Sequence, residues 1–294
     1  MTDVNEQSFS TGSGTDTAPV RHSKSFRQRI PAPIWRFRPT LQPVAVVKTI
    51  KTQIIPKIVL ALRSTPKTAK TTKPAPTAVE EFAALTLAND DGAAFAHVEE
   101  LLARGTAVEA IFLDLLAPAA RQLGTLWESD TTDFASVTLA VGRLQLIMRR
   151  LGDRFVSEAS GGHAGESVLL TNIPGEQHSF GLSMVAEFFR REGWNLCTGP
   201  FASHQELTSL VHNHWFDIVG FSVSSDRRLD ELKKDIHDIR RVSRNRDVGI
   251  IIGGPMVIAQ PDLVASMGAD MMSADATTAP QQAHGLIEQM KART

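Results

Sequence analysis

The sequence lacks several features that would each place a chain in a familiar class. Cys197 is the only cysteine, which excludes an intrachain disulfide framework and a zinc site built from cysteines. No apolar run reaches the roughly 18 residues that a transmembrane helix needs. The N-terminus also lacks the apolar core of a signal peptide. We therefore expect a cytoplasmic protein that has no contact with a membrane.

Acidic residues are scarce in the first quarter of the chain. Residues 1–75 contain 13 Lys and Arg but 3 Asp and Glu, whereas the remainder contains 18 and 29, so the net charge of -1 combines +10 with -11. Residues 1–76 also hold most of the prolines, and such a stretch buries too little apolar surface to offset its ordering entropy. We predict a disordered basic tail and linker. Its apolar islands at 34–37 and 54–62 would dock on a partner, on DNA or on the protein's own body, or belong to a solvated linker.

Residues 77–159 are predicted to form a small bundle of four or five helices. Segments rich in Ala, Leu and Glu carry apolar residues at helical spacing, with short breaks at 89–92, 105–106 and 129–133. Thr106 and Glu109 have the spacing of a capping box. Trp127 ends a helix before a polar loop, where it would plug the bundle or cover a flat ligand.

Residues 160–294 begin with a Gly-rich hinge at 160–165 and then alternate apolar runs with helical segments. Strands are expected at 167–173, 194–198, 217–224, 248–253 and 270–273, and helices at 180–192, 204–214, 227–244, 261–267 and 278–291. Continuously apolar strands indicate a sheet covered by helices on both faces. The sequence therefore predicts an α/β fold with a flavodoxin-like, doubly wound parallel sheet.

The loop after the first predicted strand carries a candidate metal ligand, His178. It lies at the carboxyl end of a strand, which is where open α/β sheets bind ligands. Glu176 would accept a hydrogen bond from the other ring nitrogen and fix the tautomer. Gly181 would let the next helix begin close to a bulky group. A single loop histidine is more often solvated, so this loop alone does not establish a site.

Two further loops are expected at the same edge of the sheet. The third strand ends at Ser222 and Ser224, whose hydroxyls can exchange hydrogen bonds with a ligand, although they are equally suited to cap a helix. The fourth ends at Gly253 and Gly254, where missing side chains would leave a channel, although such a pair is also ordinary turn chemistry. Together they predict a slot walled by small residues. The first strand has no Gly-rich loop after it, which argues against a nucleotide site.

These three motifs resemble the signature of the cobalamin-binding domain family, which reads D-x-H-x-x-G, then S-x-L or a variant, then G-G. Forty residues separate Gly181 from Ser222, and 28 separate Ser224 from Gly253, close to the family's usual gaps. The chain departs from the signature at Glu176, which replaces Asp, and at Ser224, which replaces Leu.

The resemblance implies a role for each of these residues. His178 would replace the cofactor's own base as the lower ligand of cobalt, with Glu176 in support. The displaced nucleotide tail would enter the slot formed by the serine and glycine loops, at Ser222, Ser224, Gly253 and Gly254.

The helical region adds a second resemblance. Residues 123–128 read LGTLWE and resemble a motif in the cap domain of methionine synthase and of cobalamin-dependent photoreceptors. This implies that Trp127 covers the upper face of the cofactor. Where the photoreceptors have Glu-His, this chain has Val137 and Thr138, which argues against a histidine as upper ligand and against adenosylcobalamin.

The motifs PGEQH at 174–178 and FFRREGW at 188–194 most resemble the aerobic anti-repressor family (AerR, also called PpaA) of purple photosynthetic bacteria. The resemblance implies a light- or redox-responsive regulator, not an enzyme, that binds hydroxocobalamin and acts on a transcriptional repressor of photosynthesis genes. The basic tail would be free to contact DNA. Two alternatives stay open: a corrinoid methyl-carrier protein of a methyltransferase system, and a haem-binding sensory domain with His178 as axial ligand.

Overall fold

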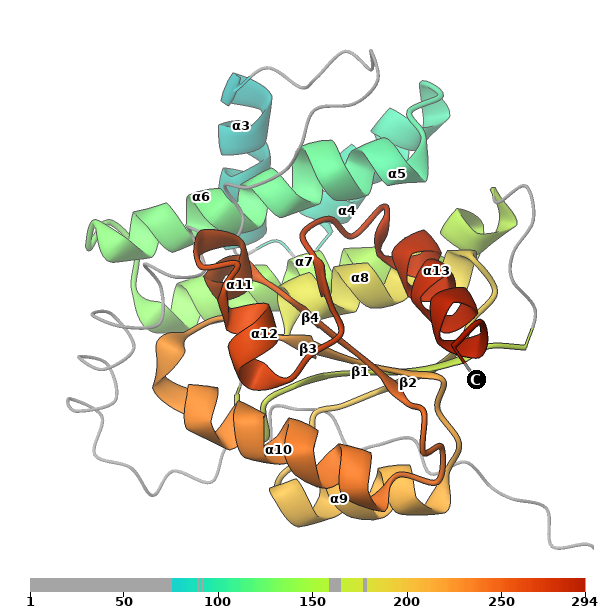
Figure 1. Cartoon of the computed structure of the whole chain (residues 1–294). Coiled ribbons are helices and arrows are strands. Elements are labelled where there is room, and N and C mark those ends of the chain that lie inside the picture. Colours follow the sequence, from blue (N-terminus) through green and yellow to red (C-terminus); the bar gives the residue numbers. More distant parts are fainter. Residues whose placement is uncertain (1–75, 89, 91, 159–164, 177–178, 294) are drawn as a thin grey trace, which may run out of the picture. The chain divides into compact units, whose positions relative to one another are not determined.

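The structure is a computed structural model and describes residues 76–88, 90, 92–158, 165–176 and 179–293 (Figure 1). The predicted tail, with its two apolar islands, lies outside these residues, as does most of the predicted hinge. Among the described residues, a helical region precedes an α/β region. None of the described helices combines the length and apolar character that a membrane span requires.

The helical region ends and restarts near the predicted breaks. Its elements are α3 (Pro76–Leu87), α4 (Ala93–Ala103), a continuous rod of α5 (Val108–Ala110), η1 (Ile111–Leu116) and α6 (Ala117–Glu128), and α7 (Phe134–Ser157). The rod tolerates Pro118 because a π-helical segment, η1, comes just before it. The Ala117 amide bonds to Phe112 O, five residues back, so the register has already changed where proline lacks a donor.

The predicted capping box at Thr106 is wrong. The N-cap of α5 is Ala107, whose own side chain makes no capping hydrogen bond. The Val108 amide instead donates to Glu158 Oε2 at 3.4 Å, and Glu109 pairs with Arg191. Tertiary partners have therefore replaced the local cap.

The α/β region contains a five-stranded sheet of order β2-β1-β3-β4-β5, in which every neighbouring pair is parallel. This order is flavodoxin-like and confirms the predicted fold class. Its elements are β1 (Ser167–Asn172), α8 (Phe180–Arg191), β2 (Asn195–Thr198), α9 (His204–Asn213), β3 (Ile218–Ser222), η2 (Asp226–Arg228), α10 (Leu229–Val242), β4 (Gly249–Gly253), α11 (Pro255–Ala259), α12 (Leu263–Met267), β5 (Met271–Ser273) and α13 (Ala279–Lys291). Short helix α11 was not predicted.

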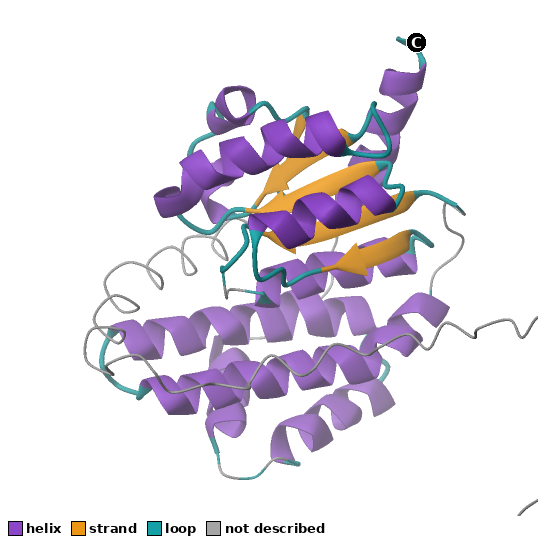
Figure 2. Cartoon of the chain, turned by 90° about the horizontal axis from the view of Figure 1, so that it is seen from below, coloured by secondary structure: helices purple, strands orange, loops and turns teal. Residues whose placement is uncertain are grey.

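Helices cover both faces of the sheet. In Figure 1, α8 and α13 lie above the strands and α9 and α10 below them, and Figure 2 shows α9 and α10 in front of the sheet. In one buried cluster, Leu169, Val219 and Ile250 of the sheet pack against α9 and α10. Cys197 packs against this cluster as a partly buried small residue, and burial raises the pKa of its thiol.

Helix α8 is shared between the sheet and the helical region, because it buries side chains on two faces. Toward the sheet it contributes Leu182, Ala186 and Phe189. Toward the helical region it contributes Phe180, Met184 and Phe188, which join the core of α3 to α7. The helix that follows the β1 loop is therefore also part of the bundle core.

Candidate functional site at the carboxyl edge of the sheet

The strand register brings four small residues into one row at the carboxyl edge of the sheet. The last residues of four strands pair across the sheet in the order Asn172, Ser222, Gly253 and Ser273. Their side chains are an amide, two hydroxyls and a hydrogen, so the row has hydrogen-bonding groups and no bulk. Asn172 and Ser273 were not predicted as site residues. For Asn172 a signal was present, because a polar residue closes an otherwise apolar strand.

The loop after β1 is held by a tight turn and by an arginine from beyond β3. The Glu176 amide donates to Ile173 O at 2.9 Å, and Gly175 has a φ of +84°, which favours glycine. Arg228 Nη1 donates to Pro174 O at 2.5 Å. A Cβ on Gly175 would lie 2.8 Å from the same nitrogen. No local pattern pointed to Arg228, because its partner, Pro174, lies 54 residues away in the chain.

Glu176 and Ser224 meet across two loops. Ser224 Oγ donates to Glu176 Oε2 at 2.8 Å, so this serine orients the carboxylate as well as lining the edge. Gln177 and His178 lie outside the described residues, and the role of His178 as cobalt ligand stays a prediction. The support that Glu176 would give to His178 is likewise untested.

The two glycines at the end of β4, Gly253 and Gly254, allow backbones to approach closely. A Cβ on Gly253 would lie 2.7 Å from Ser273 O, and one on Gly254 would lie 2.7 Å from Val223 O. Gly254 also has a φ of +98°. At these two residues the structure therefore differs from the predicted open channel, because neighbouring backbone fills the space beside each Cα.

The surroundings of Gly181, at the start of α8, differ from those of Gly253 and Gly254. A Cβ on Gly181 would meet no atom within 4 Å, so open space lies beside the first turn of the helix. Just before it, the Ser179 hydroxyl accepts a hydrogen bond from Gln145 Nε2 on α7 at 3.2 Å. The loop that carries His178 in the sequence is thus bounded by an open helix start and a contact from the helical region.

Trp127 lies at the end of α6, as predicted, and belongs to the core of the helical region. It is 2% exposed, and its ring centroid lies 5.8 Å from that of Phe134. Its Nε1 has no acceptor among the described residues. Its position agrees with a plug at the bundle end, whereas its predicted role as a cover for a cofactor stays a prediction.

Comparison with known proteins gives two matches to family models and one similar protein. Residues 166–283 and residues 78–152 each match a family described as B12 binding domain. A protein of Rhodobacter capsulatus, described as an uncharacterized 20.5 kDa protein in the bchF-crtJ intergenic region, is 31% identical over 177 residues. The match covers 60% of this chain and 92% of that protein. The chain belongs to the B12-binding family. Its cofactor is cobalamin, which includes cobalt, and the predicted family and cofactor are confirmed.

One solved structure shares this fold. The monomethylamine corrinoid protein of Methanosarcina barkeri is 14% identical with a TM-score of 0.58, over 70% of this chain and 97% of that one. A cobalamin-binding protein from Desulfitobacterium hafniense DCB-2 is 18% identical with a TM-score of 0.37, over 71% and 98%. The first likeness shows a shared fold, and the second carries no further argument.

The described residues of this B12-binding protein fit a cobalamin at the carboxyl edge. Gly181 leaves room beside the loop that contains His178, as a broad macrocycle requires. Ser224 holds the Glu176 carboxylate two residues before that histidine, the kind of carboxylate that orients a metal-binding imidazole. The row from Asn172 to Ser273 offers polar groups without bulk for the rest of the cofactor.

Proposed function

We propose that this chain is a cobalamin-dependent regulator of photosynthesis genes, of the anti-repressor type, and not an enzyme. The observation that carries the proposal is the 31% identity, over 92% of its length, to a protein whose name places its gene between bchF and crtJ. It agrees with the resemblance of residues 174–178 and 188–194 to anti-repressors. In this proposal the protein acts in the cytoplasm on a transcriptional repressor, in response to light or oxidation.

In this proposal His178 is the lower ligand and hydroxocobalamin is the bound form. Bound cobalamin supplies a cobalt ion whose upper ligand can be exchanged. The chain's own residues would hold the cofactor: Ser224 orients Glu176, and Ser222, at the end of β3, would contact the nucleotide tail. Gly181 leaves room for the macrocycle.

Helix α8 is suited to pass the state of this site to the helical region. It begins at Phe180, two residues after His178, and its Phe188 ring meets Phe155 of α7 edge-on with centroids 5.1 Å apart. Arg191 lies over the same Phe155 ring at 4.5 Å and pairs with Glu109. A change at the loop would therefore reach the bundle core through α8, whereas rotation about the 160–165 hinge alone would have to break this packing.

A spectroscopic experiment tests the ligand. The full chain, reconstituted with hydroxocobalamin, is expected to retain corrin absorption bands after gel filtration, and His178→Ala is expected to lose them while remaining folded. His237→Ala is the matched control, because His237 is exposed on α10. Retention of cobalamin by His178→Ala with unchanged affinity would contradict the assignment. A Soret band from protein purified out of its native host would instead favour the haem alternative.

A second experiment tests regulation. Binding of the repressor to a photosynthesis promoter is measured by gel shift with the cobalamin-loaded chain, the cofactor-free chain and the loaded His178→Ala variant. We expect only the loaded wild-type chain to change repressor binding, with a difference between light and darkness. The same effect from all three proteins would show that the cofactor does not control the chain.

A corrinoid methyl-carrier is the second candidate, because a solved structure of the same fold is titled as a corrinoid protein. A carrier would transfer a methyl group from its loaded cofactor to a thiol acceptor together with a methyltransferase partner. Transfer at a catalytic rate, without any effect on repressor binding, would favour this reading.

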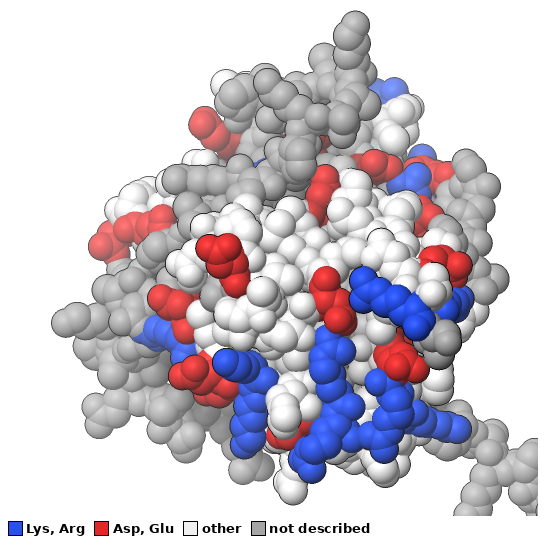
Figure 3. Space-filling model, in the orientation of Figure 1, with Lys and Arg blue, Asp and Glu red and all other residues white. Residues whose placement is uncertain are grey.

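DNA contact is a separate part of the proposal. The tail carries the net charge of +10 noted above, and the described residues add exposed cations on and after α10: Lys233, Lys234, Arg241 and Arg244. Figure 3 shows Lys and Arg gathered over this lower part of the face. Salt-dependent DNA binding that disappears when residues 1–75 are deleted would assign the contact to the tail.

A further inference from the structure

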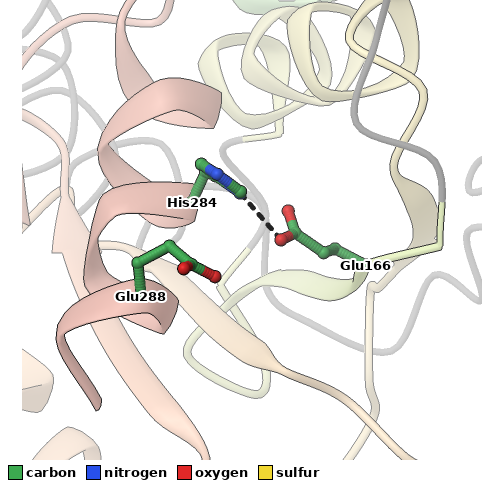
Figure 4. A group of neighbouring side chains, drawn as sticks. All are labelled: Glu166, His284 and Glu288. Atoms are coloured by element: carbon green, nitrogen blue, oxygen red, sulfur yellow. Dashed lines mark hydrogen bonds and ion pairs between the residues drawn. The ribbon is translucent and has the colours of Figure 1, made fainter. Parts of the chain in front are cut away.

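A cluster of metal-binding side chains lies at the amino edge of the sheet, opposite the cofactor site. Glu166 directly precedes β1, and His284 and Glu288 lie one turn apart on α13 (Figure 4). One ligand atom from each of the three residues lies within 4.8 Å of the other two. Residues 118 positions apart in the sequence are thus brought to one point by the last helix of the fold.

The three side chains are oriented toward one another. His284 Nδ1 and Glu166 Oε1 are 2.7 Å apart, and Figure 4 shows the Glu288 carboxylate on the same side of α13, below the imidazole. The Glu166 side chain is 16% exposed and that of His284 34%. The second oxygen of Glu166, Oε2, is buried and has no hydrogen-bond partner among the described residues. A buried carboxylate oxygen without a donor is costly unless a cation occupies the space beside it.

The charge around the cluster is also unbalanced. Asp217 lies nearby and, together with Glu166 and Glu288, acts on the ammonium of Lys291, whose pKa they raise, Glu288 most strongly. Lys291 Nζ lies 2.9 Å from Glu288 Oε1. Three carboxylates thus act on a single lysine.

We propose that Glu166, His284 and Glu288 form a binding site for a divalent transition-metal ion, with Zn²⁺ as the ion that the ligands fit best. One imidazole nitrogen and two carboxylate oxygens suit zinc, which accepts these ligands at about 2.0–2.2 Å and takes water as a fourth ligand. Calcium and magnesium are bound mainly by oxygen, so the histidine disfavours them.

Metal binding would replace the proton between His284 and Glu166 and would displace Lys291 from Glu288. The ion would then connect α13 to the residue just before β1, at the end of the sheet opposite the proposed cobalamin site. The site is thus structural and independent of the proposed function.

The experiment uses the full chain without cobalamin, treated with a chelator and then desalted. Zn²⁺ is titrated in competition with a chromogenic chelator, and Tm is measured with and without the ion. We expect one equivalent of Zn²⁺ to bind and, at about a hundredfold excess over Kd, to raise Tm by roughly 5 °C. Cobalt(II) in place of zinc should give the visible absorption of a low-coordinate site.

The variants test whether these residues hold the ion. His284→Gln and Glu288→Gln should each weaken binding by at least about tenfold and remove the rise in Tm, whereas His237→Gln on α10 should change neither. Lys291→Met should bind zinc more tightly, because the competing ammonium is gone. Zinc binding that is equally tight in Glu288→Gln and the wild-type chain would overturn the proposal, as would a wild-type chain whose Tm does not respond to zinc. Glu288 is exposed, so this variant is expected to fold.

Discussion

The two edges of the parallel sheet are built from different side chains. At the amino edge, carboxylates accept hydrogen bonds from amides in the first two residues of strands. Asp217 Oδ2 accepts from the Ser167 amide at 2.8 Å, and Asp270 Oδ2 accepts from the Ile250 amide at 2.7 Å. Arg240 Nη2 adds a contact to Asp270 at 2.8 Å. Charged groups therefore satisfy the strand ends where no cofactor is expected.

The carboxyl edge has short neutral groups in the corresponding positions. The side chains of its row, Asn172, Ser222, Gly253 and Ser273, carry no charge. A carboxylate at this edge, that of Glu176, comes from a loop and accepts a hydrogen bond from Ser224. The two ends of one sheet thus differ in chemistry: charged side chains stabilise the amino end, and neutral groups stand at the carboxyl end, where open α/β sheets bind ligands.

The largest loss of stability is expected at the carboxyl edge, from Gly254→Ala. The new Cβ would lie 2.7 Å from Val223 O and 2.9 Å from Val223 N, at a φ of +98°. Backbone strain of this kind costs about 1–3 kcal/mol, and the clash adds to it, so we expect a loss of about 3 kcal/mol or more in urea unfolding.

Gly181→Ala is the control for this prediction. Its Cβ would meet nothing within 4 Å, and alanine favours a helix over glycine by about 1 kcal/mol, so the free energy of unfolding should stay equal or rise. Cobalamin affinity should nevertheless fall if the macrocycle occupies that space. Equal stability of the two alanine variants would contradict the difference in packing between Gly254, which is surrounded by backbone, and Gly181, which has open space beside it.

At the amino edge, Asp270→Ala is expected to cost about 2 kcal/mol. It leaves the buried Ile250 amide without its side-chain acceptor, and an unsatisfied buried donor costs about 1–3 kcal/mol. Asp262→Ala is the control, because Asp262 is exposed and caps no helix with its side chain. Cobalamin affinity, measured by spectral titration, should not change in either variant. A large drop in affinity with Asp270→Ala would show that the two edges are not independent.

The sequence was sufficient for features that depend on neighbouring residues. Continuous apolar runs such as Val168 to Thr171 predict buried parallel strands, and alternation with helical segments predicts the doubly wound order. The three edge motifs likewise follow from order and spacing along the chain. Each of these signals is local or requires only the topology of a parallel sheet.

Features that depend on distant neighbours could not be predicted. Gly253 and Gly254 suggest empty space in the sequence, but Ser273 O and Val223 O fill it, and those atoms belong to other strands and loops. Similarly, in place of the expected cap at Thr106, the Val108 amide contacts Glu158, which lies 50 residues further along the chain. The apolar residues of α8 also gave no indication of which would face the bundle.

A smaller effect is expected from Ser224→Ala, which removes the hydrogen bond to Glu176. The cost to stability should be about 1 kcal/mol, because the pair is partly exposed. Cobalamin affinity should fall by roughly three- to tenfold, since a misoriented carboxylate no longer supports the ligand loop. Ser225→Ala is the matched neighbour, because the Ser225 side chain makes no capping hydrogen bond. Identical cobalamin titrations for both variants would remove Ser224 from the site.

The smallest effect is expected at Asp235, a carboxylate that belongs to neither edge of the sheet and serves as a comparison for both. Asp235 on α10 is buried, and burial raises the pKa of its carboxyl above the ordinary 3.8, although the contact with His204 lowers it in part. A raised folded-state pKa means that the native state binds the proton more tightly than the unfolded chain. Its contribution to stability is thus fully present below pH 3.8 and is lost as pH rises through the raised value. The difference in unfolding free energy between wild type and Asp235→Asn, followed by urea denaturation upward from about pH 3.5, should therefore decrease with pH and then level off. A difference that grew over that range would mean that pairing with His204 lowers the pKa of Asp235 by more than burial raises it. Asp235 would then stabilise the fold as a charged carboxylate, as the carboxylates at the amino edge of the sheet do.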